Sequence, residues 1–199
     1  TTPPHEAHIR SVIDCYDFRC RLKIRESAPP RKVKEIELFD PYDDKLTYDD
    51  IKGHKIPSVM TTHVWIRYAH PMRLLYQLTI NVGKWMLFYP VEQMDTMWAK
   101  AKNLYNGERL NGVLSILCST AKKNPRASGL NSGVICFVCG PEDNRDHVLR
   151  LGEHLVKEMD YKSENGFIAF KSELQSITGT RSTGQVRNTL YQLPVPRPS

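Results

Sequence analysis

Two apolar runs joined by a polar loop restrict the fold of this chain more than any other feature. The runs cover residues 113–118 and 134–139, and each has the length and composition of a buried strand. Residues 119–133 between them are polar and show no helical pattern. Parallel neighbours need a crossover of about a dozen or more residues, usually a helix. A helix-free connection therefore favours an antiparallel sheet over a parallel βαβ arrangement.

The clearest helix follows the second of these runs. Asp143 or Asn144 is suited to be its N-cap, because a short polar side chain can accept a hydrogen bond from a free backbone N–H. Apolar residues then recur at i, i+3, i+4 and i+7. These residues are Val148, Leu151, Gly152, Leu155, Val156 and Met159.

Two further helices and several further strands are expected. Asp95 is suited to cap a helix with Trp98, Ala101 and Tyr105 on its inner face. Pro71 at N1 and Gly83 at C′ are typical of the two ends of a shorter helix. The additional strands are expected at residues 62–68, 85–89, 167–171 and 186–193. We expect an α+β layer arrangement with the helices on one face of the sheet.

The apolar pattern also predicts which side chains form the core. All three tryptophans, Trp65, Trp85 and Trp98, lie in apolar strands or helix faces, so we expect them to be core residues. The residues expected to be buried together are Trp85, Trp98, Ile135, Phe137, Val148, Leu151 and Leu155.

The ends of the chain differ from its middle. Residues 1–60 form a distinct N-terminal section with a possible helix and strands, residues 61–193 form the main domain, and residues 194–199 form a Pro-rich tail. In residues 19–25, basic residues alternate strictly with other residues, so in a strand all the cations would lie on one side. This stripe is either a phosphate-tracking surface or a charged, solvated edge strand. The chain begins Thr-Thr-Pro-Pro without Met, which indicates a fragment.

Charge and composition limit the partners. The 28 Lys and Arg residues outnumber the 22 Asp and Glu residues, which gives a net charge of +6. A mildly basic protein is compatible with an anionic partner without requiring one. No apolar run is long enough to span a bilayer, so no membrane is expected. Five cysteines, an odd number, argue for a reducing compartment, and we expect a cytoplasmic protein with a nuclear location left open.

No motif with a catalytic mechanism is present. Cys136 and Cys139 are three residues apart in a strand and should point to opposite faces, which does not suit a metal or redox pair. Cys15 and Cys20 have no histidine at matching spacing. The chain contains no nucleophile elbow, metalloprotease helix motif, phosphate-binding loop or dinucleotide fingerprint. We expect no enzyme activity, no cofactor, no metal and no catalytic residue.

The loop of residues 121–129 is the sharpest candidate for binding. It carries Lys122, Lys123 and Arg126 and no acidic residue, between two strands expected to be buried. Loops held by rigid strands often carry binding residues. A plain solvated loop is the alternative.

An ordered series of short motifs resembles the cap-binding translation initiation factor 4E superfamily. The motifs, in chain order, are Gly83-Lys84-Trp85 with residues 86–88, Met94-Asp95-x-x-Trp98, Arg126-Ala127 before residues 134–138, Asn144-Arg145 and residues 180–184. Within the superfamily the pattern is most similar to the basophilic leukaemia-expressed protein family, in which Pro-Arg-Ala precedes a Val-Ile-Cys strand, here residues 125–127 and 134–136. The resemblance covers about residues 62 to 193 and implies a curved antiparallel sheet with helices on its convex face.

Departures from that superfamily bear on function. The initiation factor holds methylated guanine between two tryptophans, with a glutamate on the base edge. Here residues 74–82 contain Tyr76 as their only aromatic residue and no acid, and the third tryptophan position falls on Val138. The phosphate-side arginine is matched by Arg126.

The resemblance therefore implies a non-catalytic RNA- or nucleotide-binding protein without the aromatic cap clamp. The expected phosphate-binding residues are Lys122, Lys123, Arg126, Arg181 and Arg187. The alternative is a protein-interaction adaptor that uses the helical face, and an enzyme with an unrecognised site is the third possibility.

Overall fold

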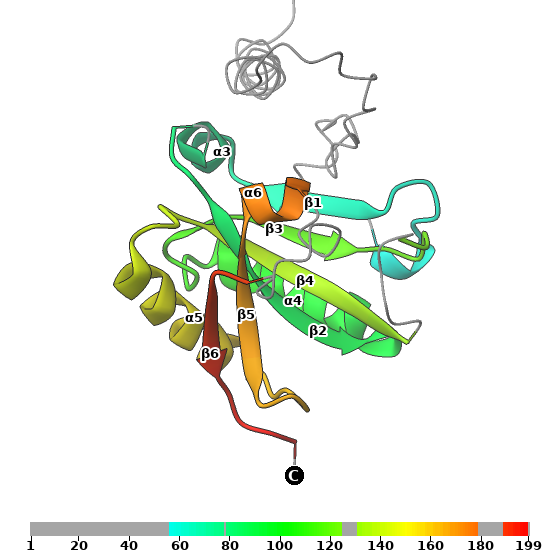
Figure 1. Ribbon diagram of the computed structural model, residues 1–199. Helices are drawn as coiled ribbons and strands as arrows, with labels where there is room; N and C mark the ends of the chain where they lie inside the picture. Colours follow the sequence, from blue (N-terminus) through cyan, green and yellow to red (C-terminus); the bar gives the residue numbers. More distant parts are fainter. Residues whose placement is uncertain (1–55, 78, 125–130, 179–188, 199) are drawn as a thin grey trace, which may run out of the picture.

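The computed structural model of the chain describes residues 56–77, 79–124, 131–178 and 189–198 (Figure 1). The stripe from Arg19 to Arg25 and the pair Cys15 and Cys20 lie outside these ranges.

The described chain forms one six-stranded sheet in the order β1-β3-β4-β2-β5-β6. Every neighbouring pair is antiparallel, which confirms the prediction made from the helix-free connection between β3 and β4. The strands are β1 (Trp65–Ala69), β2 (Gly83–Pro90), β3 (Val113–Ser119), β4 (Ser132–Cys139), β5 (Phe167–Ser172) and β6 (Tyr191–Pro194).

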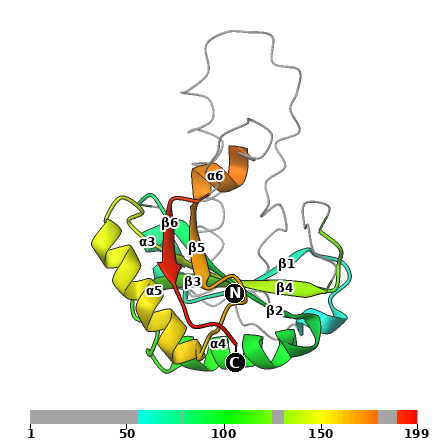
Figure 2. The ribbon, with the colours of Figure 1, turned by 60° about the horizontal axis from the view of Figure 1, so that its bottom comes forward.

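Four α-helices and two 3-10 turns connect the strands. They are η1 (Pro57–Val59), α3 (Pro71–Gln77), η2 (Val91–Gln93), α4 (Met94–Asn106), α5 (Arg145–Met159) and α6 (Glu173–Thr178). The two long helices, α4 and α5, lie together on the outside of the bend in the sheet (Figure 2). The structure is thus the expected α+β arrangement, a curved antiparallel sheet with the two long helices on its convex face. The short helices α3 and α6 lie at one end of the sheet, apart from α4 and α5. No helix in the described ranges is long and apolar enough to cross a bilayer.

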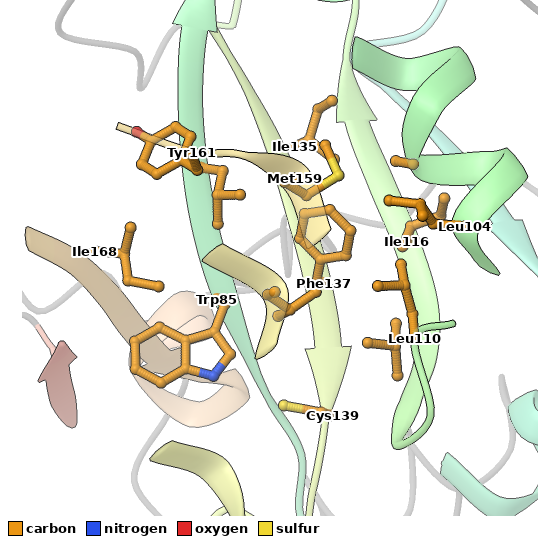
Figure 3. Close-up of a cluster of buried hydrophobic side chains, with 14 of the residues drawn as sticks. Trp85, Leu104, Leu110, Ile116, Ile135, Phe137, Cys139, Met159, Tyr161 and Ile168 are labelled. Carbon is orange, nitrogen blue, oxygen red and sulfur yellow. The ribbon is translucent and has the colours of Figure 1, made fainter. Parts of the chain in front are cut away.

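The main core lies between the sheet and these two helices (Figure 3). It contains all seven side chains that were expected to be buried together. The Trp85 indole N–H donates to the backbone carbonyl of Val148 at 3.1 Å, so the central strand is bonded to α5 as well as packed on it. Trp85 also contacts Phe170 edge to face, with ring centroids 5.3 Å apart.

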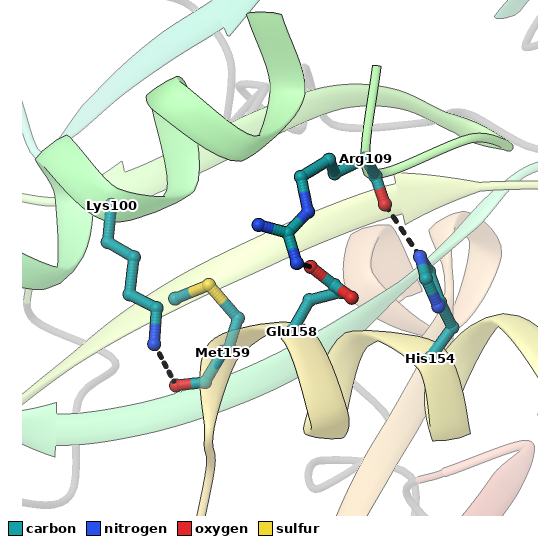
Figure 4. Close-up of polar contacts among 5 residues, drawn as sticks. All are labelled: Lys100, Arg109, His154, Glu158 and Met159. Carbon is teal, nitrogen blue, oxygen red and sulfur yellow. Dashed lines mark hydrogen bonds and ion pairs between the residues drawn. The ribbon is translucent and has the colours of Figure 1, made fainter. Parts of the chain in front are cut away.

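Polar contacts join α5 to α4 and to the turn after α4 (Figure 4). Arg109 forms an ion pair with Glu158 at 2.6 Å, and the Arg109 carbonyl lies 2.6 Å from Nε2 of His154. Lys100 of α4 donates to the Met159 carbonyl at 2.9 Å, which supplies a partner for one of the free carbonyls at the end of α5. These contacts hold the helical layer in place.

Two predicted helix boundaries are wrong. The helix that begins at Pro71 ends at Gln77, and Gly83 is the first residue of β2 rather than a helix C′ residue. Gly83 is required there because a Cβ would lie 2.4 Å from the Phe170 ring. Asp95 is not the N-cap of α4; its carboxylate instead accepts from the backbone N–H of Ser58 at 2.9 Å and from the Ser58 hydroxyl at 2.5 Å.

The other predicted boundaries agree more closely. Asn144 is the N-cap of α5, and its side chain accepts from the His147 N–H at 3.2 Å. The last strand starts at Tyr191, later than the predicted residue 186, and residues 186–188 lie outside the described ranges.

Candidate nucleic-acid interface

The face of the sheet that points away from α4 and α5 is called the open face below. Strand alternation assigns its residues, since successive side chains of a strand point to opposite sides. In β2, Trp85, Leu87 and Tyr89 belong to the main core, so Lys84, Met86 and Phe88 lie on the open face.

All the cations of the six strands lie on the open face. They are Lys84 of β2 and Lys171 of β5, both half-buried, and Arg67 of β1, which is only 5% exposed; each alternates with residues of the main core. The strands contain no Asp or Glu. Lys84 and Lys171 are direct cross-strand partners, an arrangement of like charges that is unfavourable by itself. The strands thus give this face a positive charge.

Trp65 was expected to be a core residue; it lies on the open face, where it packs against a smaller apolar cluster and not in the main core. Its ring is half-buried, and the Lys84 ammonium lies 5.8 Å from the ring centroid. Trp65 and Lys84 belong to β1 and β2, which are separated by β3 and β4 in the sheet. Their contact therefore reaches across β3 and β4 on this face.

A small apolar cluster occupies the middle of this face. Its buried members are Val82, Leu114, Leu117, Cys136 and Val138, with Trp65, Ile80, Met86 and Val134 packed against them. Val138, the position matched to a cap-side tryptophan, is thus a buried aliphatic residue of this cluster.

A hollow lies beside the cluster, between the ends of α3 and α6. Gln77, Lys84 and Glu173 contribute its polar side chains, and Val82, Gly83 and Val138 complete it. Gln77 is held by the Ser115 hydroxyl, which donates to its side-chain oxygen at 3.0 Å. Glu173 is anchored by its own backbone N–H, which donates to the Val82 carbonyl at 3.0 Å. The hollow therefore combines one carboxylate with the Lys84 ammonium.

Lys122 and Lys123 follow the end of β3, and both are exposed. The Lys122 backbone N–H donates to the Met60 carbonyl at 3.1 Å, and its ammonium donates to the Thr62 carbonyl at 2.6 Å. The segment is therefore fixed against the chain that leads into β1. The other three predicted phosphate-binding residues, Arg126, Arg181 and Arg187, lie outside the described ranges.

The cysteines of the described strands are buried thiols. Cys136 lies in the open-face cluster and Cys139 in the main core, which confirms that the pair points to opposite faces. Burial raises the pKa of both thiols and of Cys118, because it disfavours the charged thiolate. These residues are therefore poor nucleophiles and poor metal ligands.

Two exposed aromatic residues were missed by the sequence interpretation. Phe88 was assigned to a continuous buried run, yet its side chain is 52% exposed, and Phe167 of β5 is 40% exposed. Alternation in each strand carried the signal. Phe88 is two residues from Met86 and four from Lys84, so it shares their face, and Phe167 is next to the buried Ile168 and points to the opposite face.

Comparisons with known proteins find a likeness in fold only. No protein-family model matches the sequence, and no curated protein matches it. Similar solved chains include schistosome eIF4E with m7GpppA and 4E-BP, at 14% identity and a TM-score of 0.41, covering 57% of this chain and 59% of that one. Ascaris suum eIF4E-3 with m7G cap is 12% identical, with a TM-score of 0.43 and 58% of each chain covered.

A third similar chain is C. elegans eIF4E-3 in complex with the 4E-binding protein Mextli and a cap analog. It is 12% identical, with a TM-score of 0.41 and 57% of each chain covered. The matched part spans less than two thirds of each of these solved chains. The fold class stated above rests on the strand order and packing of this chain itself.

Proposed function

We propose that this chain is a non-catalytic protein that binds RNA or a nucleotide through phosphate groups on the open face. The distribution of charge over the sheet carries the proposal. Lys84 and Lys171 are the two partly exposed cations of the six strands and lie on one face with the buried Arg67, and no strand residue is acidic. Lys84 and Lys171 are cross-strand partners, so one phosphate group could contact both ammonium groups.

Lys122 and Lys123 extend the proposed surface at one end of the sheet. In this proposal Arg126, Arg181 and Arg187 bind phosphates as well, with Arg126 making a planar, bidentate contact. Contacts of this kind fix the position of a nucleic acid without reading its sequence. Binding should therefore be similar across unrelated RNA sequences and weaken steeply with salt.

The same proposal includes the absence of a tight cap clamp. Val138 occupies a clamp position and is buried among aliphatic side chains, and Tyr76 is an exposed residue of α3. Stacking contributes about 1–3 kcal/mol per base, so losing a two-sided clamp removes most of the affinity for methylguanosine. We expect no retention on cap-analogue resin at physiological salt. Specific elution by free cap analogue would contradict this part of the proposal.

The alternative function, a protein-interaction adaptor that uses the helical face, has less support than RNA or nucleotide binding. The fully exposed side chains of α5 are Arg145, Asp146, Arg150, Glu153, His154 and Lys157, all of them polar. A helix that docks a peptide would present an apolar stripe. Buried thiols with raised pKa values, together with the lack of a catalytic motif, support the non-catalytic part of the proposal.

We also propose membership of the basophilic leukaemia-expressed protein family and a cytoplasmic location. The ordered motifs of residues 83–98 and 125–136 support the first, and the odd cysteine count supports the second. Fluorescence microscopy of the tagged full-length protein tests the location.

Fluorescence anisotropy with labelled RNAs of unrelated sequence tests the main proposal. Lys84→Gln and Lys171→Gln should each weaken binding and make the plot of log affinity against log salt shallower by about 0.7–0.9. Arg150→Ala is the matched control, because it removes an exposed charge from α5 on the other face. The phosphate proposal fails if wild-type binding is insensitive to salt or if the control weakens binding as much as the lysine variants do.

A further inference from the structure

Two exposed phenyl rings lie on the open face, and the proposed phosphate contacts give neither ring a role. Phe88 is 52% exposed and Phe167 is 40% exposed, whereas their strand neighbours Leu87 and Ile168 are almost completely buried. Alternation puts Phe88 on the face that carries Lys84, and Phe167 on the face that carries Lys171. Both rings therefore present apolar surface to solvent on the most basic face of the sheet.

The two rings lie at the same end of neighbouring strands. The pairing of β2 with β5 runs from Gly83↔Ser172 to Met86↔Ala169. Each phenylalanine is two residues beyond this last pair, on its own strand. The two rings thus lie on the same face of the sheet, beyond the end of the β2–β5 pairing, and each offers a flat surface to one base of a single strand.

The backbone at Phe88 is held by a side chain rather than by β5. The Phe88 N–H donates to the Tyr161 hydroxyl at 3.1 Å, and that hydroxyl lies 3.1 Å from the Phe88 carbonyl, to which it donates. Tyr161 is itself buried, with its ring edge to face against Tyr89 at 5.2 Å between centroids. Phe88 is thus an exposed ring on a fixed backbone, which suits a preformed binding platform.

Lysines lie on two sides of the exposed rings. Lys84 and Lys171 are on the same two strands, four residues along from Phe88 and Phe167 respectively. A second pair of lysines lies beyond the neighbouring strands β4 and β3. Phe88 is opposite Val134 of β4, and the Val134 N–H donates to the hydroxyl of Ser119, the last residue of β3. Lys122 and Lys123 follow directly after that strand. Aromatic rings among cations match a ligand with flat apolar faces and negative charge.

We propose that Phe88 and Phe167 form a stacking platform for unpaired bases of a single-stranded RNA, whose phosphates lie against the lysines of the open face. This deepens the function proposed above and rests on it. Every base has a flat face, so stacking of this kind tolerates any sequence. Bases inside a duplex are already stacked on each other, so the platform selects single strands.

Anisotropy with a labelled 12-nucleotide single-stranded RNA, and with the same strand annealed to its complement, tests the platform. Phe88→Ala and Phe167→Ala should each weaken single-strand binding between about 5-fold and about 150-fold, the equivalent of one stacked base. The salt slope should not change, because no phosphate contact is removed. Phe88→Tyr keeps a ring and should bind like the wild type, and duplex should bind more weakly than single strand. Equal binding of duplex and single strand would overturn the proposal.

Met72→Ala is the matched control, since it truncates an apolar side chain that is 60% exposed on α3. Urea midpoints verify that each variant is folded. If the wild type binds RNA with a salt slope and both alanine variants bind equally well, the platform is wrong while the phosphate surface stands. If the wild type binds no RNA, both proposals fail. If Phe88→Ala abolishes self-association in sedimentation and leaves RNA affinity unchanged, the rings serve an interface between copies and the platform is again overturned.

Discussion

Replacing Gly152 with alanine should destabilise the protein, although alanine is the better helix former. A Cβ at this position of α5 would lie 2.7 Å from two carbons of the Trp85 ring. Favourable carbon–carbon contacts are about 3.5–4.0 Å, so helix and ring must separate by about 1 Å. Trp85 is completely buried, and its N–H donates to Val148 of the same helix, so the separation also strains that hydrogen bond.

Opposing effects of known size decide the outcome. Overpacking costs about 1–3 kcal/mol, and weakening the Trp85 hydrogen bond costs up to about 1 kcal/mol. The gain in helix propensity from Gly to Ala is about 1 kcal/mol. We therefore expect a net loss of about 1.5 kcal/mol in the free energy of unfolding, with about 3 kcal/mol as the upper limit. At a urea dependence of about 2 kcal/mol per molar, the midpoint should fall by roughly 0.8 M and by no more than about 1.5 M.

Urea titration followed by circular dichroism measures this midpoint. The control is Glu153→Ala, because Glu153 is the next residue of α5 and is exposed. The control should stay within about 0.5 kcal/mol of the wild type. A Gly152→Ala protein that unfolds at the same or a higher urea concentration than the wild type would refute the close packing of α5 on Trp85.

Three other substitutions test separate contacts. Tyr161→Phe removes the hydroxyl that bonds both backbone groups of Phe88, and calorimetry should show a loss of about 1–3 kcal/mol; an unchanged melting temperature would contradict this. Asn144→Ala removes the side-chain cap on the His147 N–H and should cost about 0.5–2 kcal/mol in urea titration, whereas equal midpoints would show that the cap is dispensable. Burial, and secondarily the charge of Tyr161, raises the pKa of Tyr89, so the unfolded chain loses this proton first as pH rises. Stability should therefore fall above about pH 10, by up to about 1.4 kcal/mol per pH unit for this group. Tyr89→Phe should show a shallower fall between pH 9 and pH 11, and identical slopes would count against a buried, neutral Tyr89.

The candidate interface was only partly accessible to sequence interpretation. Lys122 and Lys123 were predicted as binding residues because a basic loop between apolar strands is a local pattern; the structure describes both as exposed, and their binding role stays a prediction. The charged row of Arg67, Lys84 and Lys171 was not found. These cations come from three strands that are far apart in sequence; the fold puts all three on one face and makes Lys84 and Lys171 cross-strand partners.

Patterns of short range were sufficient for the antiparallel sheet and the main core. The helix-free connection between β3 and β4 determined their pairing, the 3.6-residue period of α5 determined its buried face, and the spacing of Cys136 and Cys139 put them on opposite sides. The cap at Asn144 was equally local, since donor and acceptor are three residues apart. Each of these follows from the repeat geometry of one element.

Only the tertiary structure decided which side of each element is covered and where each element ends. A strand period says that Trp65, Arg67, Met86 and Phe88 lie apart from the main core, but not which of them stay exposed. Gly83 lies in β2 beside the Phe170 ring, which fills the space of its missing Cβ and belongs to β5, a distant segment of the chain. Burial depends on neighbours that are distant in sequence, and no local pattern contains them.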